Sequence, residues 1–199
     1  MKMSEAGRAA LTAREGKALK AYRDIAGVLT IGVGHTSMAG PPRVTIGLII
    51  TEAECDAILA RDLVSFEGTV NGALTRAVPQ ACFDALVSLC FNIGAGAFAG
   101  STVVKRINAG DLDGAAEAML MWNKPSAIRT RRQGEYRQFK AGLTSLADRT
   151  SAAAMPVSAP SPSLAKPAPA ALAALPYGRR RSLITPLLAA LPWWRKLDR

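Results

Sequence analysis

The sequence contains no apolar run long enough to cross a membrane as a helix. Such a helix needs about 20 consecutive apolar residues, and none occurs although 49% of the 199 residues are hydrophobic. Cysteine and histidine are scarce too, with three residues and one. A membrane-spanning helix and a small disulfide scaffold are therefore excluded. The apolar content also excludes a wholly disordered chain, and the length is sufficient for one sizeable core.

The three cysteines have neither the even number of a disulfide framework nor the spacing of a metal site. Cys55, Cys82 and Cys90 each fall in a segment with a helical pattern. Free cysteine is among the residue types that are most often buried. We therefore expect three structural thiols and no metal site.

Acidic residues are fewer than basic ones, with 15 Asp and Glu against 25 Lys and Arg and a formal charge of +10. This excess favours a polyanionic partner, such as nucleic acid, anionic lipid or a cell-wall polymer. The excess is unevenly placed, because residues 1–150 carry a net +4 and residues 151–199 a net +6. The last quarter of the chain is therefore its most cationic part.

The first residues, MKMSEAGRAALTAREG, lack the pattern of a secretory signal. Glu5, Arg8 and Arg14 interrupt them before any apolar run of sufficient length. We therefore expect synthesis and folding in the cytoplasm. A target outside the membrane then requires another agent to open the way.

Helical and strand-like patterns together predict an α+β domain dominated by helices. The run GVLTIGVGHT combines β-branched residues with glycines, which indicates short strands and tight turns, so a small hairpin or sheet is expected between residues 22 and 36. Thr51 and Glu54 have the spacing of a capping box that opens a helix. Segment 79–94 is apolar on nearly all sides, as expected for a central helix. The other helices are expected at residues 3–14, 102–109, 112–122 and 126–141.

A change of composition marks the end of this domain. Between residues 151 and 176, ten Ala, six Pro and four Ser make up 20 of 26 residues, which favours an extended linker over a packed core. Beyond it, basic residues bracket an apolar middle that ends in Trp193 and Trp194. We therefore predict a domain at 1–148, an Ala/Pro/Ser-rich linker at 149–176 and a cationic tail at 177–199.

The tail has two interpretations, and both stay open. Its cationic ends, aliphatic middle and paired tryptophans suit contact with a membrane or lipopolysaccharide surface. However, Pro186 and Pro192 interrupt any continuous amphipathic helix. In the alternative, the tail folds back onto the domain or extends from it without fixed structure.

Glu15 and Asp24 are candidates for paired acid and base chemistry. Hydrolysis of a glycosidic bond needs one carboxylic acid to protonate the leaving oxygen, and a second carboxylate that acts as nucleophile or activates water. Glu15 ends the first expected helix, where partial burial would raise its pKa. Asp24 lies in a polar loop at the entrance to the hairpin, where it would stay ionised. At this spacing, solvated surface carboxylates are the plainer interpretation, so the pair alone is weak support for an enzyme.

The sequence around this pair resembles a known family. EGKALKAYRDIAGVLTIGVGHT is similar to the phage-type lysozymes, or endolysins, of glycoside hydrolase family 24, which place Glu, then Asp or Cys, then Thr at fixed spacings. This chain has Glu15, Asp24 and Thr30 at those positions. Residues 84–111 resemble the central helix and following turn of that family, and residues 122–139 resemble its closing Trp and Arg segment.

The resemblance implies a lysozyme-like fold, with a small N-terminal lobe that carries the hairpin, a larger helical lobe, and a cleft between them for peptidoglycan. It implies hydrolysis of the β-1,4 bond between N-acetylmuramic acid and N-acetylglucosamine, without metal or cofactor. Glu15 would then be the general acid, Asp24 would hold or activate the attacking water, and Thr30 would help to position that water. Inversion at the anomeric carbon and a monomeric protein are expected.

The resemblance also implies a role in host lysis. An endolysin without a secretion signal accumulates in the host cytoplasm, and a holin releases it to the periplasm and the cell wall. The holin is therefore an expected partner, beside peptidoglycan itself.

The only histidine, His35, is expected to be structural. It follows two glycines at the end of the hairpin, where the resembling family uses its histidine structurally rather than as a general base. Its acidic partner cannot be identified from the sequence.

An arginine cluster precedes Glu135, and the resemblance places an arginine near the catalytic carboxylate. Arg129 and Arg132 are candidates for contact with Glu15, and the alternative interpretation is that the whole cluster forms an exposed basic face. Arg131 is instead expected on an exposed basic face, since both it and Arg132 have helical spacing to Glu135.

A polysaccharide cleft also needs amide and hydroxyl groups that bind acetamido and hydroxyl substituents. Candidates lie at the expected turns and helix ends, with one arginine besides. They are Asn92, Ser101, Thr102, Asn123 and Arg129.

Two other function classes also account for the excess of positive charge. A cationic envelope-binding or membrane-disrupting protein that acts through its tail explains the +6 charge and the tryptophan pair. Nucleic-acid binding explains the charge but not the Glu15, Asp24 and Thr30 arrangement, and no predicted helix has a basic stripe with interleaved aromatics. We therefore expect no nucleic-acid partner.

Overall fold

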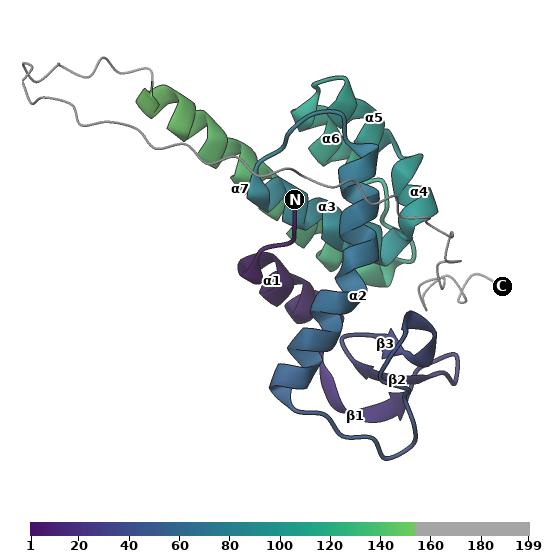
Figure 1. Ribbon diagram of the computed structural model, residues 1–199. Helices are drawn as coiled ribbons and strands as arrows, with labels where there is room; N and C mark the ends of the chain where they lie inside the picture. The colour runs from purple at the N-terminus through teal and green to yellow at the C-terminus, as the bar shows by residue number, and fades with distance from the viewer. Residues whose placement is uncertain (154–199) are drawn as a thin grey trace, which may run out of the picture.

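The computed structural model describes residues 1–153, which form two lobes (Figure 1). The small lobe is an antiparallel sheet of strands β1 (Ala18–Arg23), β2 (Leu29–Gly32) and β3 (His35–Thr36), followed by the 3₁₀ turn η1 (Ser37–Ala39). A second 3₁₀ turn, η2 (Ser126–Ile128), precedes the last helix. The helices are α1 (Glu5–Glu15), α2 (Glu52–Ala73), α3 (Gln80–Ile93), α4 (Ala95–Ala99), α5 (Thr102–Asn108), α6 (Leu112–Met119) and α7 (Arg129–Ala153).

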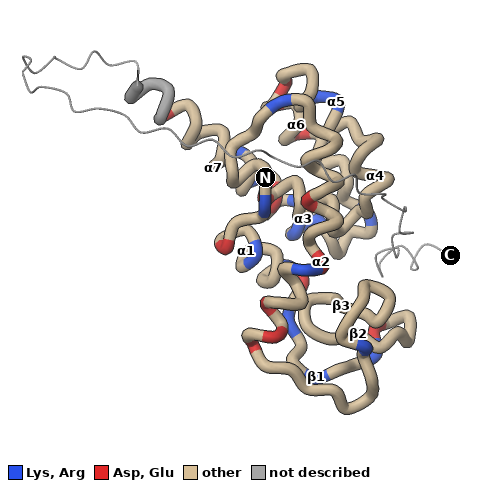
Figure 2. Tube along the Cα trace, viewed as in Figure 1, with Lys and Arg blue, Asp and Glu red and all other residues tan. Residues whose placement is uncertain are grey.

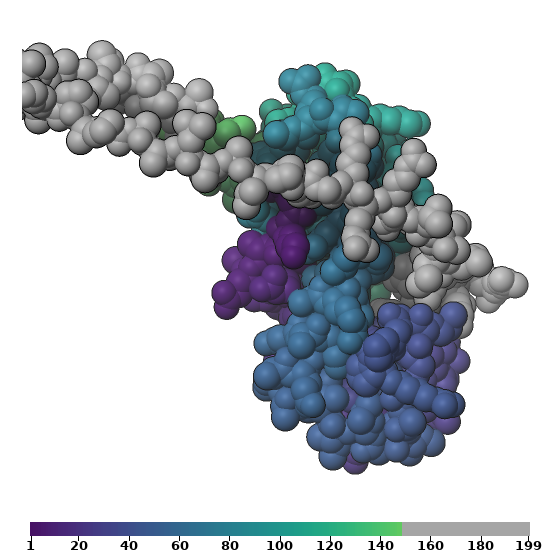
Figure 3. Space-filling model, in the orientation of Figure 1, coloured from purple at the N-terminus to yellow at the C-terminus, as the bar shows by residue number. Residues whose placement is uncertain are grey.

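The arrangement confirms the predicted combination of a small sheet lobe and a larger helical lobe. Helix α2 runs from the sheet into the helical lobe, and the small lobe appears as a separate mass at one end of it (Figures 1 and 3). Helix α1 packs against α3 in the helical lobe, although it precedes the sheet in sequence. The last residue of α1, Glu15, therefore lies where the chain passes from one lobe to the other.

The sheet is short, and its order is β1-β2-β3. Strand β2 is central, so that Thr30 lies opposite Tyr22 on one side and Thr36 on the other. A turn closed by the Gly27 N–H, which donates to the Asp24 carbonyl, joins β1 to β2. Gly27 has a φ of 76°, a value that glycine adopts without strain. The turn holds Asp24 at the tip of the hairpin.

Helix α2 begins as the sequence predicts. The Thr51 N–H donates to Glu54 Oε2 at 2.7 Å and the Glu54 N–H donates to Thr51 Oγ1 at 3.2 Å, which forms the reciprocal capping box. Acidic residues gather in this first turn (Figure 2), where their negative charges interact favourably with the positive end of the helix dipole. Elsewhere in residues 1–153, basic and acidic residues are spread over both lobes (Figure 2).

Helix α3 is the centre of the large lobe and packs against α1, α2 and α7. Its contact with α7 is close because Gly142 has no side chain: a Cβ there would lie 2.7 Å from Cys82 Sγ. Cys55, Cys82 and Cys90 are all buried and free. Burial raises the pKa of the Cys82 and Cys90 thiols to about 12, so both stay protonated. The prediction of structural thiols is confirmed.

Three helix predictions differ from the structure. Helix α4 lies between the helices predicted at 79–94 and 102–109, and it forms around the fully buried Phe98 despite its glycines. Residues 126–128 form η2, so that α7 begins at Arg129. Helix α7 also continues to Ala153, past the expected end at residue 141. The rest of the linker at 149–176 and the whole tail at 177–199 lie outside the described residues.

The N-terminus of α1 is fixed by a buried carboxylate. Asp84 on α3 accepts the Ser4 N–H at 2.9 Å and also the Ser4 hydroxyl, and Gln80 donates to it at 2.8 Å. Ser4 in turn caps α1 through the Gly7 N–H. The two helices approach so closely that a Cβ at Gly7 would lie 2.5 Å from Asp84 Cγ.

We therefore expect Gly7→Ala to destabilise the protein. The added methyl group must displace Asp84 and weaken its hydrogen bonds, which should lower the free energy of unfolding by about 2–3 kcal/mol in urea titrations. Gly68→Ala on α2 is the matched control, because nothing lies within 4 Å of a Cβ there, and alanine in a helix should stabilise by a few tenths of a kcal/mol or more. Equal effects of the two substitutions would contradict the close approach.

Candidate active site

Glu15 is a mostly buried carboxyl group held by an arginine. Its Oε1 lies 2.6 Å from Arg131 Nη2 on α7, and each of the two side chains is 9% exposed. Gly16, with a φ of 80°, ends α1 directly after it and donates its N–H to the Thr12 carbonyl. The end of α1 and the first turn of α7 thus meet at this pair.

The pKa of Glu15 is raised above the ordinary value of a glutamate, as the sequence predicts. Burial is the main cause, since it disfavours the charged form. The charge of Arg131 and its hydrogen bond oppose the rise, while the negative charge of Glu135 adds to it. Burial outweighs the arginine, and Glu15 keeps its proton to a higher pH than an exposed glutamate.

Asp24 has a different environment. Its Oδ1 accepts the Val28 N–H at 2.8 Å, and its backbone N–H donates to the Val28 carbonyl at 2.9 Å. These bonds fix the carboxylate at the hairpin turn. Within residues 1–153, Oδ2 has no hydrogen-bond partner.

Tyr22 lies near the two carboxyl groups and the threonine. It lies opposite Thr30 across β1 and β2. The pKa of its phenol is raised, mainly by burial and then by the negative charges of Asp24 and Glu15. Tyr22 is therefore within electrostatic reach of both carboxyl groups. Thr30 is 4% exposed, and its hydroxyl donates to the Val28 carbonyl at 3.2 Å.

The predicted arginine partner of Glu15 is wrong. Arg131, which was placed on an exposed face, binds Glu15, whereas neither Arg129 nor Arg132 does. Arg129 is exposed at the start of α7. Consecutive residues of a helix point about 100° apart, so Arg131 faces α1 while Arg132 turns into the core.

Arg132 forms the predicted pair with Glu135, but inside the protein rather than on its surface. The two side chains are 1% and 0% exposed. Arg132 also donates to the Trp122 carbonyl at 2.8 Å and to Asn92 Oδ1, and Ser88 donates to Glu135 at 2.7 Å. These contacts tie α3, α7 and the segment before η2 together.

The five predicted substrate-binding residues fall into two groups. Asn92 and Ser101 are buried and serve the fold: Asn92 accepts from Arg132, and Ser101 caps α5 through the Val104 N–H. The others are exposed and available to a ligand. They are Thr102, Asn123 and Arg129.

His35 has the predicted structural environment, and its acidic partner is Asp62 on α2. Nδ1 lies 2.7 Å from Asp62 Oδ2 and Nε2 lies 3.0 Å from the Pro42 carbonyl oxygen. A doubly protonated ring donates both bonds. Burial opposes the charge, but the bonds to Asp62 and Pro42 outweigh it, so the pKa of His35 is raised.

This pair predicts a pH-dependent contribution to stability. Because the folded-state pKa is raised, the contribution is fully present below the unfolded-state pKa of about 6.5 and is lost as the pH rises through the folded-state value. Asp62→Asn should therefore cost about 2 kcal/mol of unfolding free energy near pH 5.5 and clearly less near pH 9. Urea titrations across this range measure it, with Asp56→Asn, exposed on the same helix, as control. A cost independent of pH would contradict the assignment.

Within residues 1–153, no three His, Cys, Asp or Glu side chains are grouped so as to hold a metal ion. No helix of this part is long and apolar enough to span a membrane.

Comparison with known proteins decides the family. The sequence profile of the family described as phage lysozyme matches residues 12–141, about two thirds of the chain. The chain belongs to the phage lysozyme family. The matched range includes Glu15, Asp24, Thr30 and Arg131, and it ends within α7.

This chain is also similar to individual relatives and to solved structures. The endolysin of Salmonella phage P22 is 40% identical over 139 residues, which are 68% of this chain and 95% of that protein. The crystal structure of a P22 lysozyme mutant aligns with a TM-score of 0.67 at 38% identity, over 70% of this chain and 98% of that one. The muramidase domain of SpmX from Asticaccaulis excentricus aligns with a TM-score of 0.61 at 35% identity, over 69% and 97%. The predicted lysozyme-like fold is thereby confirmed.

As a phage lysozyme, the chain is a glycoside hydrolase of the muramidase type, an endolysin that hydrolyses peptidoglycan in host lysis. Sequence reasoning missed three residues that the structure places beside predicted ones: Arg131 beside Glu15, Tyr22 opposite Thr30, and Asp62 beside the structural His35. The tyrosine had a usable signal, since it lies two positions before Asp24 at the start of the predicted hairpin segment 22–36. Arg131 and Asp62 had none, because their partners are distant in sequence.

Proposed function

We propose that this lysozyme cleaves the β-1,4 bond between N-acetylmuramic acid and N-acetylglucosamine, with Glu15 as general acid and Asp24 as the carboxylate that holds or activates water. The observation that carries the proposal is the environment of Glu15. A general acid needs a pKa near the operating pH, and burial raises the pKa of this carboxyl group although Arg131 lies beside it.

The reaction then follows from the two environments. Glu15 transfers its proton to the glycosidic oxygen as the bond to the anomeric carbon breaks. A water bound at Asp24 Oδ2 attacks that carbon and passes a proton to Asp24, while Thr30 helps to position this water. Arg131 stabilises the Glu15 carboxylate that remains after proton transfer, before Glu15 takes up a proton again. Inversion at the anomeric carbon is part of the proposal.

Mass spectrometry of the products tests the reaction type. Purified, lipid-free peptidoglycan treated with the full chain should lose turbidity and release fragments with a reducing N-acetylmuramic acid end, which retain the mass of one added water. Anhydro products would instead indicate a lytic transglycosylase, in which the attacking group comes from the sugar, and would contradict the role of Asp24.

We expect Arg131→Met to move the alkaline limb of the activity profile to higher pH. Both effects of Arg131 lower the pKa of Glu15, so their loss lets the acid keep its proton further into the alkaline range. The maximal rate should fall about tenfold, because Glu15 loses the group that orients it. Arg137→Met, at an exposed position on the same helix, is the control. A limb that moves toward lower pH would contradict this account.

Substrate contacts are proposed for Asn92, Ser101, Thr102, Asn123 and Arg129. The exposure of the last three supports direct contact with sugar substituents. The burial of Asn92 and Ser101 supports an indirect contribution through the backbone that they hold.

The cellular route is proposed from the family resemblance. The chain accumulates in the host cytoplasm, acts as a monomer, and reaches the periplasm and cell wall after a holin opens the membrane. Host cells that produce the chain without a holin should stay intact, whereas cells that also produce one should lyse. Lysis without the holin would contradict this route.

A second function, binding to the outer membrane or lipopolysaccharide, is proposed for the tail. Its net +6 charge and paired tryptophans favour it. A chain that ends at residue 153 should keep full activity on purified peptidoglycan and lose activity on intact cells that have an outer membrane. Equal activity of both chains on intact cells would remove this function.

A further inference from the structure

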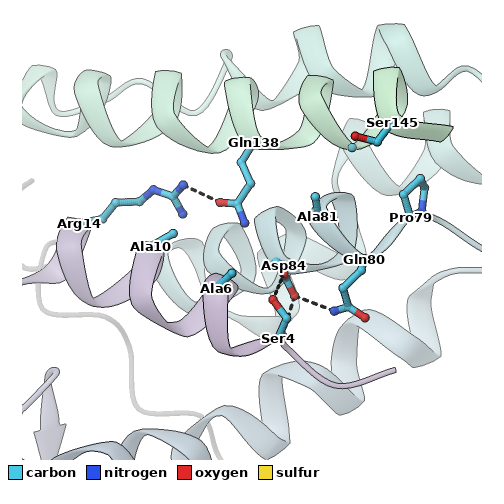
Figure 4. Close-up of a pocket in the computed structure, with 11 residues that line it drawn as sticks. Ser4, Ala6, Ala10, Arg14, Pro79, Gln80, Ala81, Asp84, Gln138 and Ser145 are labelled. Atoms are coloured by element: carbon cyan, nitrogen blue, oxygen red, sulfur yellow. Dashed lines mark hydrogen bonds between the residues drawn. The ribbon is translucent and has the colours of Figure 1, made fainter. Parts of the chain in front are cut away.

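Arg14 joins the end of α1 to both neighbouring helices. It occupies the last turn of α1, directly before Glu15. Its Nη2 donates to Gln138 Oε1 on α7 at 2.6 Å, and its Nη1 donates to Ser88 Oγ on α3 at 3.2 Å. Figure 4 shows the side chain extending from α1 toward Gln138. One guanidinium group thus bridges three helices next to the proposed acid.

The groups that Arg14 binds are themselves fixed. Ser88 is fully buried and donates to Glu135 Oε1 at 2.7 Å. Glu135 is held by Arg132, which is bonded in turn to Trp122. Arg14 is therefore anchored to the buried network of the large lobe rather than to mobile surface groups.

The end of α1 needs such an anchor. Asp84 fixes the other end of the helix, at Ser4, and at 1.5 Å per residue about ten residues place Glu15 some 15 Å away. Terminal turns of helices fray, and Gly16 directly follows Glu15. The buried Leu11 and the ion pair of Glu15 with Arg131 also hold this end of the helix. The two bonds of Arg14 add fixed points directly beside residue 15.

We propose that Arg14 is a positioning residue of the active site, which fixes the last turn of α1 on Ser88 and Gln138 and so holds Glu15 against Arg131 and away from water. This inference rests on the proposed role of Glu15. Arg14 itself does not touch the substrate.

The surroundings of Arg14 allow chemical rescue. A groove of about 530 Å³ runs between α1, α3 and α7, and Arg14 and Gln138 line it (Figure 4). Small residues such as Ala6, Ala10 and Gly142 form much of the rest. A free methylguanidinium ion should therefore reach the space that Arg14→Ala leaves.

The experiment compares the full chain with its Arg14→Ala and Arg14→Lys variants, using initial rates on purified peptidoglycan over a range of pH. Arg14→Ala should lower the rate at saturating substrate about tenfold, with the half-saturating concentration unchanged within about twofold. Gln138→Ala removes a partner of Arg14 but no charge, so its alkaline limb should move to lower pH, because hydration removes the burial that raises the pKa of Glu15. In Arg14→Ala, the loss of the Arg14 charge, which interacts with Glu15, opposes this movement. Arg14→Lys and added methylguanidinium should each restore part of the rate.

Arg8→Ala is the matched control. Arg8 lies on the same helix and donates to the Met3 carbonyl at 2.9 Å, far from the active site, so its loss should leave the rate, the limb and the effect of methylguanidinium unchanged. If Arg14→Ala lowers only the unfolding temperature and keeps the rate, Arg14 is merely structural and the inference is overturned.

Two further variants make the outcome decisive. Should Arg14→Ala fail to fold, Gln138→Ala removes one partner only and is expected to lower the rate about threefold and to move the alkaline limb to lower pH; an unchanged rate and limb would overturn the inference. Glu15→Gln distinguishes a failure of the proposed function from a failure of the inference about Arg14. If it stays active, the proposed function fails and this inference with it, whereas an inactive Glu15→Gln beside an unaffected Arg14→Ala overturns the inference alone.

Discussion

Glu15→Gln should abolish peptidoglycan hydrolysis while leaving the fold intact. The amide has nearly the same shape and can still accept a hydrogen bond from Arg131, but it has no proton to give to the glycosidic oxygen. General acid catalysis contributes about 10²–10⁴-fold to a rate, so we expect a loss of about a thousandfold in turbidity clearance of purified peptidoglycan. The unfolding temperature should not fall, because a neutral side chain is better tolerated at this buried position.

Glu5→Gln provides the control for this substitution. It makes the same change on the same helix, at an exposed carboxyl group in the first turn, and should leave the rate unaltered. Clearance by Glu15→Gln at more than about a tenth of the parental rate would remove Glu15 from the acid role. Glutamine has no carboxyl proton, so such a rate would require a proton donor other than residue 15.

Arg132→Met should be the most destabilising of the substitutions considered. It leaves the carboxylate of Glu135 fully buried without its cationic partner, and it also removes the donors to Trp122 and Asn92. Breaking a buried ion pair on one side costs about 3–5 kcal/mol, a large part of the stability of an ordinary domain. Urea titrations at neutral pH should show this loss directly.

The double variant Arg132→Met with Glu135→Leu separates the cost of a stranded charge from the value of the pair. Replacing both partners by apolar groups is often close to neutral, so the double variant should regain most of the lost stability. Recovery should stay incomplete, because the Trp122 carbonyl and Ser88 lose their partners. Equal destabilisation of the single and double variants would contradict the ion-pair account.

The local patterns of the sequence were enough to predict much of the fold. The capping box at Thr51 and Glu54 is satisfied by residues three positions apart, and the central helix at 79–94 is apolar on nearly all sides. Strands β2 and β3 lie in the predicted run of β-branched residues between glycines, whereas β1 precedes this run. Helix α4 escaped prediction because its stability comes from burying Phe98 rather than from helix propensity.

The main residues of the candidate site could also be predicted from the sequence. Glu15, Asp24 and Thr30 lie within sixteen residues of one another, so a single helix end and a single hairpin carry all three. Their spacing, together with the resemblance to a family, predicted both the type of enzyme and the contrast between a buried acid and a loop carboxylate.

The sequence by itself determined which elements form and which residues carry the chemistry, because both depend on neighbours within a few positions. Only the tertiary structure decided which arginine binds Glu15, which acid pairs with His35, and what fixes the two ends of α1. Adjacent residues on a helix differ by about 100° in direction, so the choice of Arg131 over Arg132 depends on how α7 is rotated against α1 and α3. That rotation is set by close packing at positions such as Gly142 against Cys82, which join residues about sixty positions apart.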